Sequence, residues 1–230
     1  MRTLAFGDIH GATLNLDALL AAVAPTPDDW LIFLGDYVDR GPDSKGVIDR
    51  LIALKATHRV VFLRGNHELM MMQARGDVGM RKMWLSVGGV QCLASYAPSL
   101  GKSGRFEDVP RAHWQFLEKD CVDWLETETH LFAHAGVDPN LPMPAQTEAA
   151  IFWDFLRGPI AHVSGKTVIV GHTSQKSGEV LDYGVTVCID THAYAGGFLT
   201  CLDVNAGHYW QADALGRVRE GDRVRGEPRA

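Results

Sequence analysis

Residues 31–41 read LIFLGDYVDRG, an apolar run that leads directly into a charged loop between two glycines. Four other segments repeat this arrangement: GDIHG at 7–11, GNHE at 65–68, HAG at 134–136 and GH at 171–172. Each follows a short apolar, β-branched run of the kind that forms a buried strand. Because the carboxyl ends of such strands can meet at one sheet edge, we expect the loops to converge. The side chains that they carry are Asp8, His10, Asp36, Asn66, His134 and His172.

This set of carboxylate, amide and imidazole groups suits two divalent metal ions. A metal pair needs a bridging ligand, and a carboxylate can bridge. We place Asp8 and His10 on the first metal and Asp36 between the two. The second metal then takes Asn66, His134 and His172. Such pairs lie about 3.5–4 Å apart and clamp the attacking and leaving oxygens of a phosphoryl displacement, with a shared hydroxide as nucleophile.

A phosphate monoester also needs a proton donor and cations for its oxygens. His67 is adjacent to Asn66 and can protonate the leaving alkoxide, while Asp39 can fix the His67 tautomer. Arg40 lies in the second motif and Arg64 directly precedes GNHE, and both offer guanidinium groups to phosphate oxygens. Asn66 is a further candidate for phosphate binding.

The size and composition of the chain predict one large enzyme domain. It has 230 residues, of which 46% are hydrophobic, and a net charge of −6, which argues against a general nucleic-acid binder. Its four cysteines form no C-x-x-C pair, as is typical of reduced structural thiols. We find no apolar run of about 20 residues and no room for a signal peptide before the first strand. A soluble cytoplasmic protein is expected.

Hydrophobic periodicity predicts an α/β chain with alternating strands and helices in its first part. The expected strands there are 3–6, 31–34 and 60–63, and the expected helices are 14–23 and 44–56, the second capped by Ser44. A helical insert over about 69–128, with helices at 84–96 and 113–124, is a candidate wall or lid of the site. Later strands are expected at 131–133, 167–170, 185–189, 198–203 and 209–212. We expect a single domain over 1–215 and a polar, weakly ordered tail over 216–230.

The five motifs together resemble the phosphoprotein phosphatase family of calcineurin-like metallophosphoesterases. The segments 84–96 and 109–117 are similar to parts of the bacterial and phage-lambda-type serine/threonine phosphatases, so the resemblance covers most of the chain. It implies a two-sheet β-sandwich flanked by helices and a dinuclear manganese, iron or zinc centre, with manganese preferred. It also implies hydrolysis of phosphomonoesters without a phosphoenzyme, with the roles given above to the metal ligands, His67, Asp39 and Arg40.

The chain departs from this family at two positions. Relatives carry a second phosphate-binding arginine shortly after a tryptophan, whereas here Trp153 is followed by Asp154 and Phe155, and the first arginine is Arg157. We retain Arg157 as a candidate for that role. The usual I-D-T-G run ends here in His192, which could occupy either the site's rim or a surface turn.

These observations favour a phosphatase for phosphoserine and phosphothreonine in proteins, with phosphotyrosine and small phosphomonoesters as further substrates. One alternative keeps the metal centre and hydrolyses diadenosine tetraphosphate or another nucleotide. A second alternative is a non-catalytic binding module with the same fold, although the chain lacks none of the expected ligands. The expected partner is a phosphoprotein or phosphopeptide, with no nucleic acid and no membrane. The sequence leaves the oligomeric state open.

Overall fold

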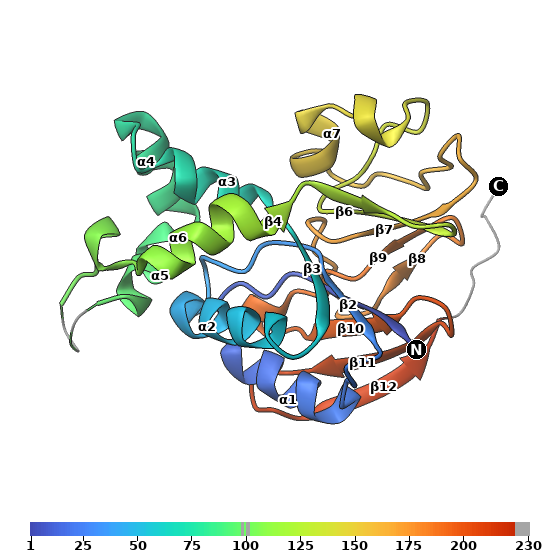
Figure 1. The fold of residues 1–230 in the computed structure, drawn as a ribbon, viewed down its shortest axis with the longest axis horizontal. Coiled ribbons are helices and arrows are strands. Elements are labelled where there is room, and N and C mark those ends of the chain that lie inside the picture. Colours follow the sequence, from blue (N-terminus) through green and yellow to red (C-terminus); the bar gives the residue numbers. More distant parts are fainter. Residues whose placement is uncertain (98, 100–101, 224–230) are drawn as a thin grey trace.

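The computed structural model describes residues 1–97, 99 and 102–223. Two β-sheets pack face to face, and helices cover their outer faces (Figure 1). The α/β fold with a two-sheet sandwich and flanking helices is therefore confirmed.

The larger sheet has seven strands in the order β12-β11-β10-β1-β2-β3-β4. Strands β1 to β4 run parallel to one another, and β10, β11 and β12 extend the sheet beyond β1 as an antiparallel meander. The bounds are β1 Thr3–Phe6, β2 Trp30–Phe33, β3 Arg59–Leu63, β4 Cys121–Val122, β10 Leu199–Asp203, β11 His208–Ala212 and β12 Val218–Asp222.

The smaller sheet has five strands in the order β5-β6-β7-β9-β8. Its central strands β6, β7 and β9 are parallel, and both edge strands are antiparallel to their neighbours. The bounds are β5 Trp124–Glu126, β6 His130–Ala133, β7 Thr167–Val170, β8 Leu181–Asp182 and β9 Thr186–Cys188.

Side-chain alternation along the strands separates three hydrophobic clusters. Between the sheets, Ala5 and Ile32 of the larger sheet share one cluster with Phe132 and Ile169 of the smaller. The opposite face of β1 and β2 packs against helices α1, Thr13–Val23, and α2, Ser44–Lys55. The outer face of the smaller sheet packs against α7, Glu148–Phe152. This arrangement leaves the carboxyl ends of the parallel strands free to carry the motif loops.

The cap of α2 differs from the expectation. Asp43 is the capping residue, because its Oδ1 accepts a hydrogen bond of 2.8 Å from the Gly46 amide. The Ser44 hydroxyl instead accepts a hydrogen bond of 3.0 Å from the Asp39 amide. Ser44 therefore supports the charged loop after β2 and does not cap its own helix.

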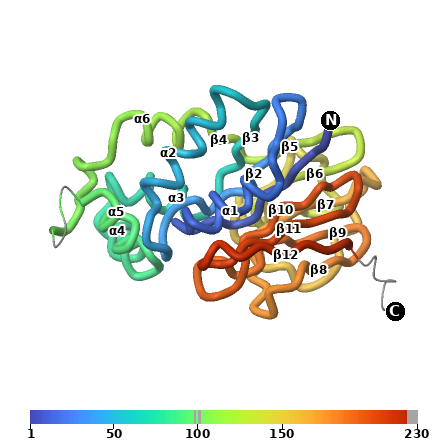
Figure 2. The backbone as a smooth tube through the Cα atoms, turned by 90° about the horizontal axis from the view of Figure 1, so that it is seen from below, coloured from blue at the N-terminus to red at the C-terminus, as the bar shows by residue number. Residues whose placement is uncertain are grey.

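The insert begins as expected with helices, which gather at the end of the molecule opposite β8 and β9 (Figure 2). The helix expected at 84–96 is not continuous, because α4, Val78–Trp84, ends at its first residue and a π-helical turn, Leu85–Gly89, separates α4 from α5, Val90–Ser95. Gly88 lies in this turn with φ 130°, and a Cβ there would lie 2.6 Å from the Arg40 amide nitrogen. The break lets the insert approach the loop after β2.

The helix expected at 113–124 is too long. Helix α6, Arg111–Gln115, and a π-helical turn, Phe116–Asp120, are followed by β4 and β5. Cys121 pairs with Phe62 of β3, and Trp124 pairs with Ala133 of β6. Pairing with these strand edges outweighs the local helical pattern, so the segment expected to be helical as far as Glu128 contributes a strand to each sheet.

The expectation of a weakly ordered tail is wrong for its first part. Strand β12 pairs with β11 along its whole length, and Arg219 donates hydrogen bonds to Gln211 and Glu179. This strand carries mainly charged side chains, so it lacks the apolar alternation that identifies strands in a sequence. Residues 224–230 lie outside the described part of the chain. Within that part, no helix is long and apolar enough to cross a membrane.

Candidate metal centre

Five loops from both sheets meet at one place. Asp8 and His10 follow β1, Asp36 follows β2, Asn66 opens α3, Asn66–Gln73, directly after β3, and His134 and His172 follow β6 and β7. The convergence predicted from the motifs is present because all five preceding strands present their carboxyl ends here.

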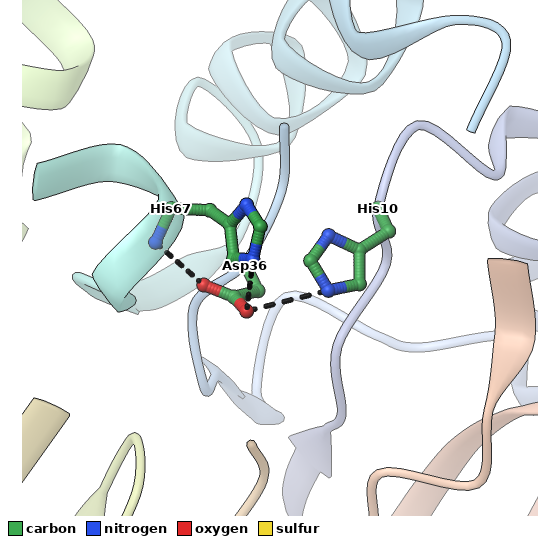
Figure 3. Close-up of side chains that lie close together, drawn as sticks. All are labelled: His10, Asp36 and His67. Atoms are coloured by element: carbon green, nitrogen blue, oxygen red, sulfur yellow. Dashed lines mark hydrogen bonds and ion pairs between the residues drawn. The ribbon is translucent and has the colours of Figure 1, made fainter. Parts of the chain in front are cut away.

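Asp36 is shared by two clusters of possible metal ligands. Its carboxylate belongs to two clusters whose possible ligand atoms lie within 4.8 Å of one another, one with His10 and His67 and one with His134 and His172. Figure 3 shows the first cluster, in which His10 and His67 lie on either side of the Asp36 carboxylate. One oxygen lies 3.3 Å from His10 Nε2, and the other lies 3.4 Å from His134 Nε2. This geometry suits a carboxylate that bridges two cations.

Burial opposes a charge on Asp36, which is 2% exposed. The surrounding histidines His134, His67 and His10 nevertheless hold the pKa of this carboxyl well below its usual range. Asp36 therefore remains an anion and can act as a ligand.

Backbone carbonyls orient the imidazoles of the candidate metal ligands. His10 Nδ1 lies 2.8 Å from the Val38 carbonyl oxygen, and His134 Nδ1 lies 2.9 Å from that of Leu34. His172 uses Nε2 for the same purpose, at 3.2 Å from the Trp153 carbonyl oxygen. Each ring thus keeps its other nitrogen for a metal, an arrangement typical of histidine ligands. Burial lowers the pKa of His134 and lowers that of His172 to about 4, which favours the neutral form that binds metals.

Asn66 and Asp8 flank the two clusters. Asn66 Oδ1 lies 3.1 Å from His134 Nε2, on the side to which the sequence assigned it. The buried Asp8 carboxylate accepts hydrogen bonds of 3.1 and 3.2 Å from the His172 amide. Burial, with the charges of Asp190 and Asp36, raises the pKa of Asp8 well above its usual value. A divalent cation would relieve this repulsion, so the donor set fits a pair of metal ions.

Three of the ligand residues have strained backbones. His10, Asp36 and His172 adopt the left-handed conformation, with φ values of 46°, 52° and 60°. Residues other than glycine rarely do so, and such strain concentrates at functional sites. The surrounding structure maintains it, for example through a hydrogen bond of 2.8 Å from the His10 amide to the Asp36 carbonyl oxygen.

His67 and Asp39 form a buried pair beside the first cluster. His67 Nδ1 lies 2.6 Å from Asp39 Oδ2, and the indole of Trp84 donates a hydrogen bond of 2.8 Å to the same oxygen. His67 Nε2 consequently faces Asp36, at 4.0 Å from its Oδ2. Burial raises the pKa of Asp39 to about 8 and lowers that of His67 to about 3. Burial thus disfavours a charge on either group.

The three candidate arginines occupy different places. Arg40 lies at the centre, where its Nη1 is 2.9 Å from His10 Nε2 and its guanidinium stacks over Tyr194 at 4.7 Å. Arg64 is directed elsewhere, because its guanidinium pairs with Asp123 and donates a hydrogen bond of 2.8 Å to the Cys121 carbonyl. The expected phosphate role of Arg64 is therefore not supported by its position. Arg157 is exposed and lines a separate cavity of about 290 Å³ behind the HAG loop.

Glu68 closes the GNHE motif, but its role in the site was not predicted from the sequence. Its buried carboxylate accepts hydrogen bonds from the amides of Asp36, Tyr37, Val38 and Gly65, at 2.8 to 3.2 Å. It thereby joins the loop of the shared ligand to the loop of Asn66. A glutamate three residues after a helix-capping glycine is the signal that could have identified it.

His192 supports the rim of the site. It is left-handed, with φ 67°, and its Nδ1 lies 2.7 Å from the Ser174 hydroxyl. Its ring packs 4.9 Å from that of Tyr194, which in turn packs edge-on at 5.2 Å against His10. Another aromatic ring, that of Phe155, stacks on the imidazole of His172, with ring centroids 5.0 Å apart. Neither aromatic residue was singled out by sequence reasoning as a contact of the metal ligands.

Comparison with known proteins agrees with this geometry. The chain is 32% identical over 142 residues to the serine/threonine-protein phosphatase PP2A-like PPG1 of Saccharomyces cerevisiae, covering 59% of this chain and 33% of the relative. It is 45% identical over 64 residues to the serine/threonine-protein phosphatase 6 catalytic subunit of Drosophila melanogaster, covering 27% of this chain and 21% of the relative. The matches thus span about a fifth to a third of these relatives.

The same fold occurs in a crystal structure assigned as a diadenosine tetraphosphatase. That structure has a TM-score of 0.64 and 20% identity, and the superposition covers 98% of this chain and 95% of the other. The sequence profile of the Calcineurin-like phosphoesterase family matches residues 1–205. The chain therefore belongs to the calcineurin-like phosphoesterase family.

Proposed function

We propose that this chain is a metal-dependent phosphomonoesterase that hydrolyses phosphoserine and phosphothreonine in proteins. The observation that carries the proposal is the position of Asp36, whose two carboxylate oxygens face histidines of two separate clusters. The match to two serine/threonine phosphatases supports the substrate class.

Two divalent ions, for which manganese is our first choice, would supply Lewis-acid activation of the phosphoryl group and of a water nucleophile. Asp8, His10, Asp36, Asn66, His134 and His172 would hold them.

Arg40 would bind and orient the phosphate. Its guanidinium lies 2.9 Å from Nε2 of His10, a proposed metal ligand, and stacks over the ring of Tyr194. A planar guanidinium donates two parallel hydrogen bonds to phosphate oxygens and compensates their charge. Asn66 offers an additional amide donor next to the site.

His67 would donate the proton that an alkoxide leaving group requires. When Nε2 gives up its proton, Nδ1 can accept the one held by Asp39 across the 2.6 Å hydrogen bond, so the imidazole stays neutral. Trp84 then stabilises the resulting Asp39 carboxylate through its indole N–H. The dyad therefore delivers a proton without leaving a charged imidazole in a buried site.

The substrate class is tested by measuring kcat/KM of the manganese-loaded protein on a phosphothreonine peptide and on diadenosine tetraphosphate in parallel. We expect a strong preference for the peptide. A preference for the dinucleotide would leave the metal and phosphate assignments in place and move the function to nucleotide turnover. That second candidate is supported by the fold shared with the structure assigned to this activity.

We also propose a cytoplasmic location. The four cysteines are free and buried, which fits a reducing compartment.

A further inference from the structure

The insert carries a groove that the proposed mechanism does not use. It has a volume of about 720 Å³ and lies between the end of α3, helix α4 and helix α6. We call it the insert groove and define it by the lining residues Arg75, Arg81, Phe106, Arg111, Trp114 and Lys119.

The insert groove is basic although the whole chain has a net charge of −6. Four cationic side chains line it, against two carboxylates, Glu107 and Glu118. Arg75 is paired with Glu118 at 2.6 Å, and among the described residues Arg81 donates only to backbone carbonyls, those of Ala74 and Arg75. These contacts leave a positive surface facing the groove.

Two of the cations have no internal counter-ion. Arg111 and Lys119 are exposed, and within the described part of the chain neither side chain forms a hydrogen bond or an ion pair. Their charges are therefore available to interact with an anionic ligand from solution.

Aromatic rings form the floor of the insert groove and fix its other cations. The guanidinium of Arg75 stacks over Trp114 at 4.1 Å, and that of Arg81 stacks over Phe106 at 4.9 Å. Stacking of this kind holds planar guanidinium groups in place, and the Glu118 carboxylate and the backbone carbonyls of Ala74 and Arg75 fix their edges. The floor is therefore rigid, and its charges are preorganised.

The groove is also joined to the catalytic pair. Phe106 stacks on Trp84, with ring centroids 5.3 Å apart, and Trp84 donates a hydrogen bond to Asp39, the partner of His67. A ligand in the groove would thus contact Phe106, which packs on the tryptophan that supports the His67–Asp39 pair.

We infer that the insert groove docks an acidic segment of the phosphoprotein substrate. This inference rests on the proposed function and specifies its substrates. Charge complementarity identifies the partner, because glutamate and aspartate side chains can pair with Arg111 and Lys119. A short acidic peptide suits a groove with four cations and two carboxylates better than a nucleic acid, whose binding needs a broad basic surface.

The test compares three substrates of the manganese-loaded chain: p-nitrophenyl phosphate, a phosphothreonine peptide flanked by glutamates, and the same peptide flanked by glutamines. In the variant Arg111→Glu/Lys119→Glu, we expect KM for the glutamate peptide to rise about five- to tenfold, with kcat within about twofold. KM for the glutamine peptide and turnover of p-nitrophenyl phosphate should be unchanged. The advantage of the glutamate peptide should also decline with added salt.

The matched control is Arg59→Glu/Lys166→Glu, which makes the same change in charge at the amino ends of β3 and β7. It should leave all three substrates unaffected. An equal rise in KM in the control, or equal effects on both peptides, would overturn the inference.

A binding measurement keeps the inference testable if the proposed function fails. The unphosphorylated glutamate peptide, carrying a fluorophore, should bind the unmodified chain and lose affinity in the Arg111→Glu/Lys119→Glu variant. Failure to hydrolyse any phosphopeptide would reject the proposed function alone. Absence of peptide binding, or tighter binding of a single-stranded oligonucleotide, would reject the groove as an acidic-peptide site.

Discussion

Replacing Asp36 with asparagine should abolish most of the activity while preserving the fold. The substitution removes a buried negative charge that lies 3.3 and 3.4 Å from histidines of the two clusters. The Asp36 carboxylate and one unit of positive charge on a bound cation about 4 Å away would interact by about 4 kcal/mol at an effective dielectric constant of about 20. Since about 1.4 kcal/mol corresponds to a tenfold change in rate, we expect kcat/KM to fall about a thousandfold.

The assay is hydrolysis of p-nitrophenyl phosphate and of a phosphothreonine peptide at saturating manganese, with circular dichroism to verify folding. Asp29→Asn is the control, because Asp29 is equally buried but lies at the amino end of β2, where it pairs with Arg2 at 2.7 Å. This control should lose stability and keep its activity per folded molecule. A loss of less than tenfold in folded Asp36→Asn would refute the bridging role of Asp36.

Three further variants test other parts of the account. His67→Asn should slow hydrolysis of alkyl phosphates more than that of aryl phosphates, whose leaving groups need no proton; equal losses would exclude His67 as the acid. Glu68→Gln removes a carboxylate that accepts four backbone hydrogen bonds, so manganese affinity measured by calorimetry should fall about 10- to 100-fold, and an unchanged affinity would contradict its positioning role. The Arg2 guanidinium holds the pKa of Asp29 well below its usual range, so this carboxylate stabilises the fold above pH ~4 and loses that effect as the pH falls further. Urea titration of Asp29→Asn should accordingly show a loss of about 1–3 kcal/mol at pH 7 that shrinks below pH ~4, and a loss independent of pH would be inconsistent with this ion pair.

The parallel core and the convergence of the candidate metal ligands could be predicted from the sequence because each signal is local. A short apolar run identifies a strand such as β1 or β7. The polar residue that follows the strand then lies at the carboxyl edge of the sheet. The strands expected at 3–6 and 167–170 have the observed bounds.

The elements that were missed depend on partners distant in sequence. β4 and β5 form because β3 and β6 offer free edges, and β12 forms on β11 despite its charged side chains. Likewise, Arg64 directly precedes the motif that carries Asn66 and yet pairs with Asp123, a residue 59 positions away. No local pattern encodes such pairings.

The most direct test of the account is the number of metal ions that the folded chain binds. After removal of all metal with a chelator and reloading with manganese, elemental analysis of the desalted protein should give two ions per chain. Asp36→Asn should retain fewer than two and show the loss of activity described above. One ion or none in the unmodified chain, or two ions retained in Asp36→Asn, would contradict a dinuclear centre bridged by Asp36.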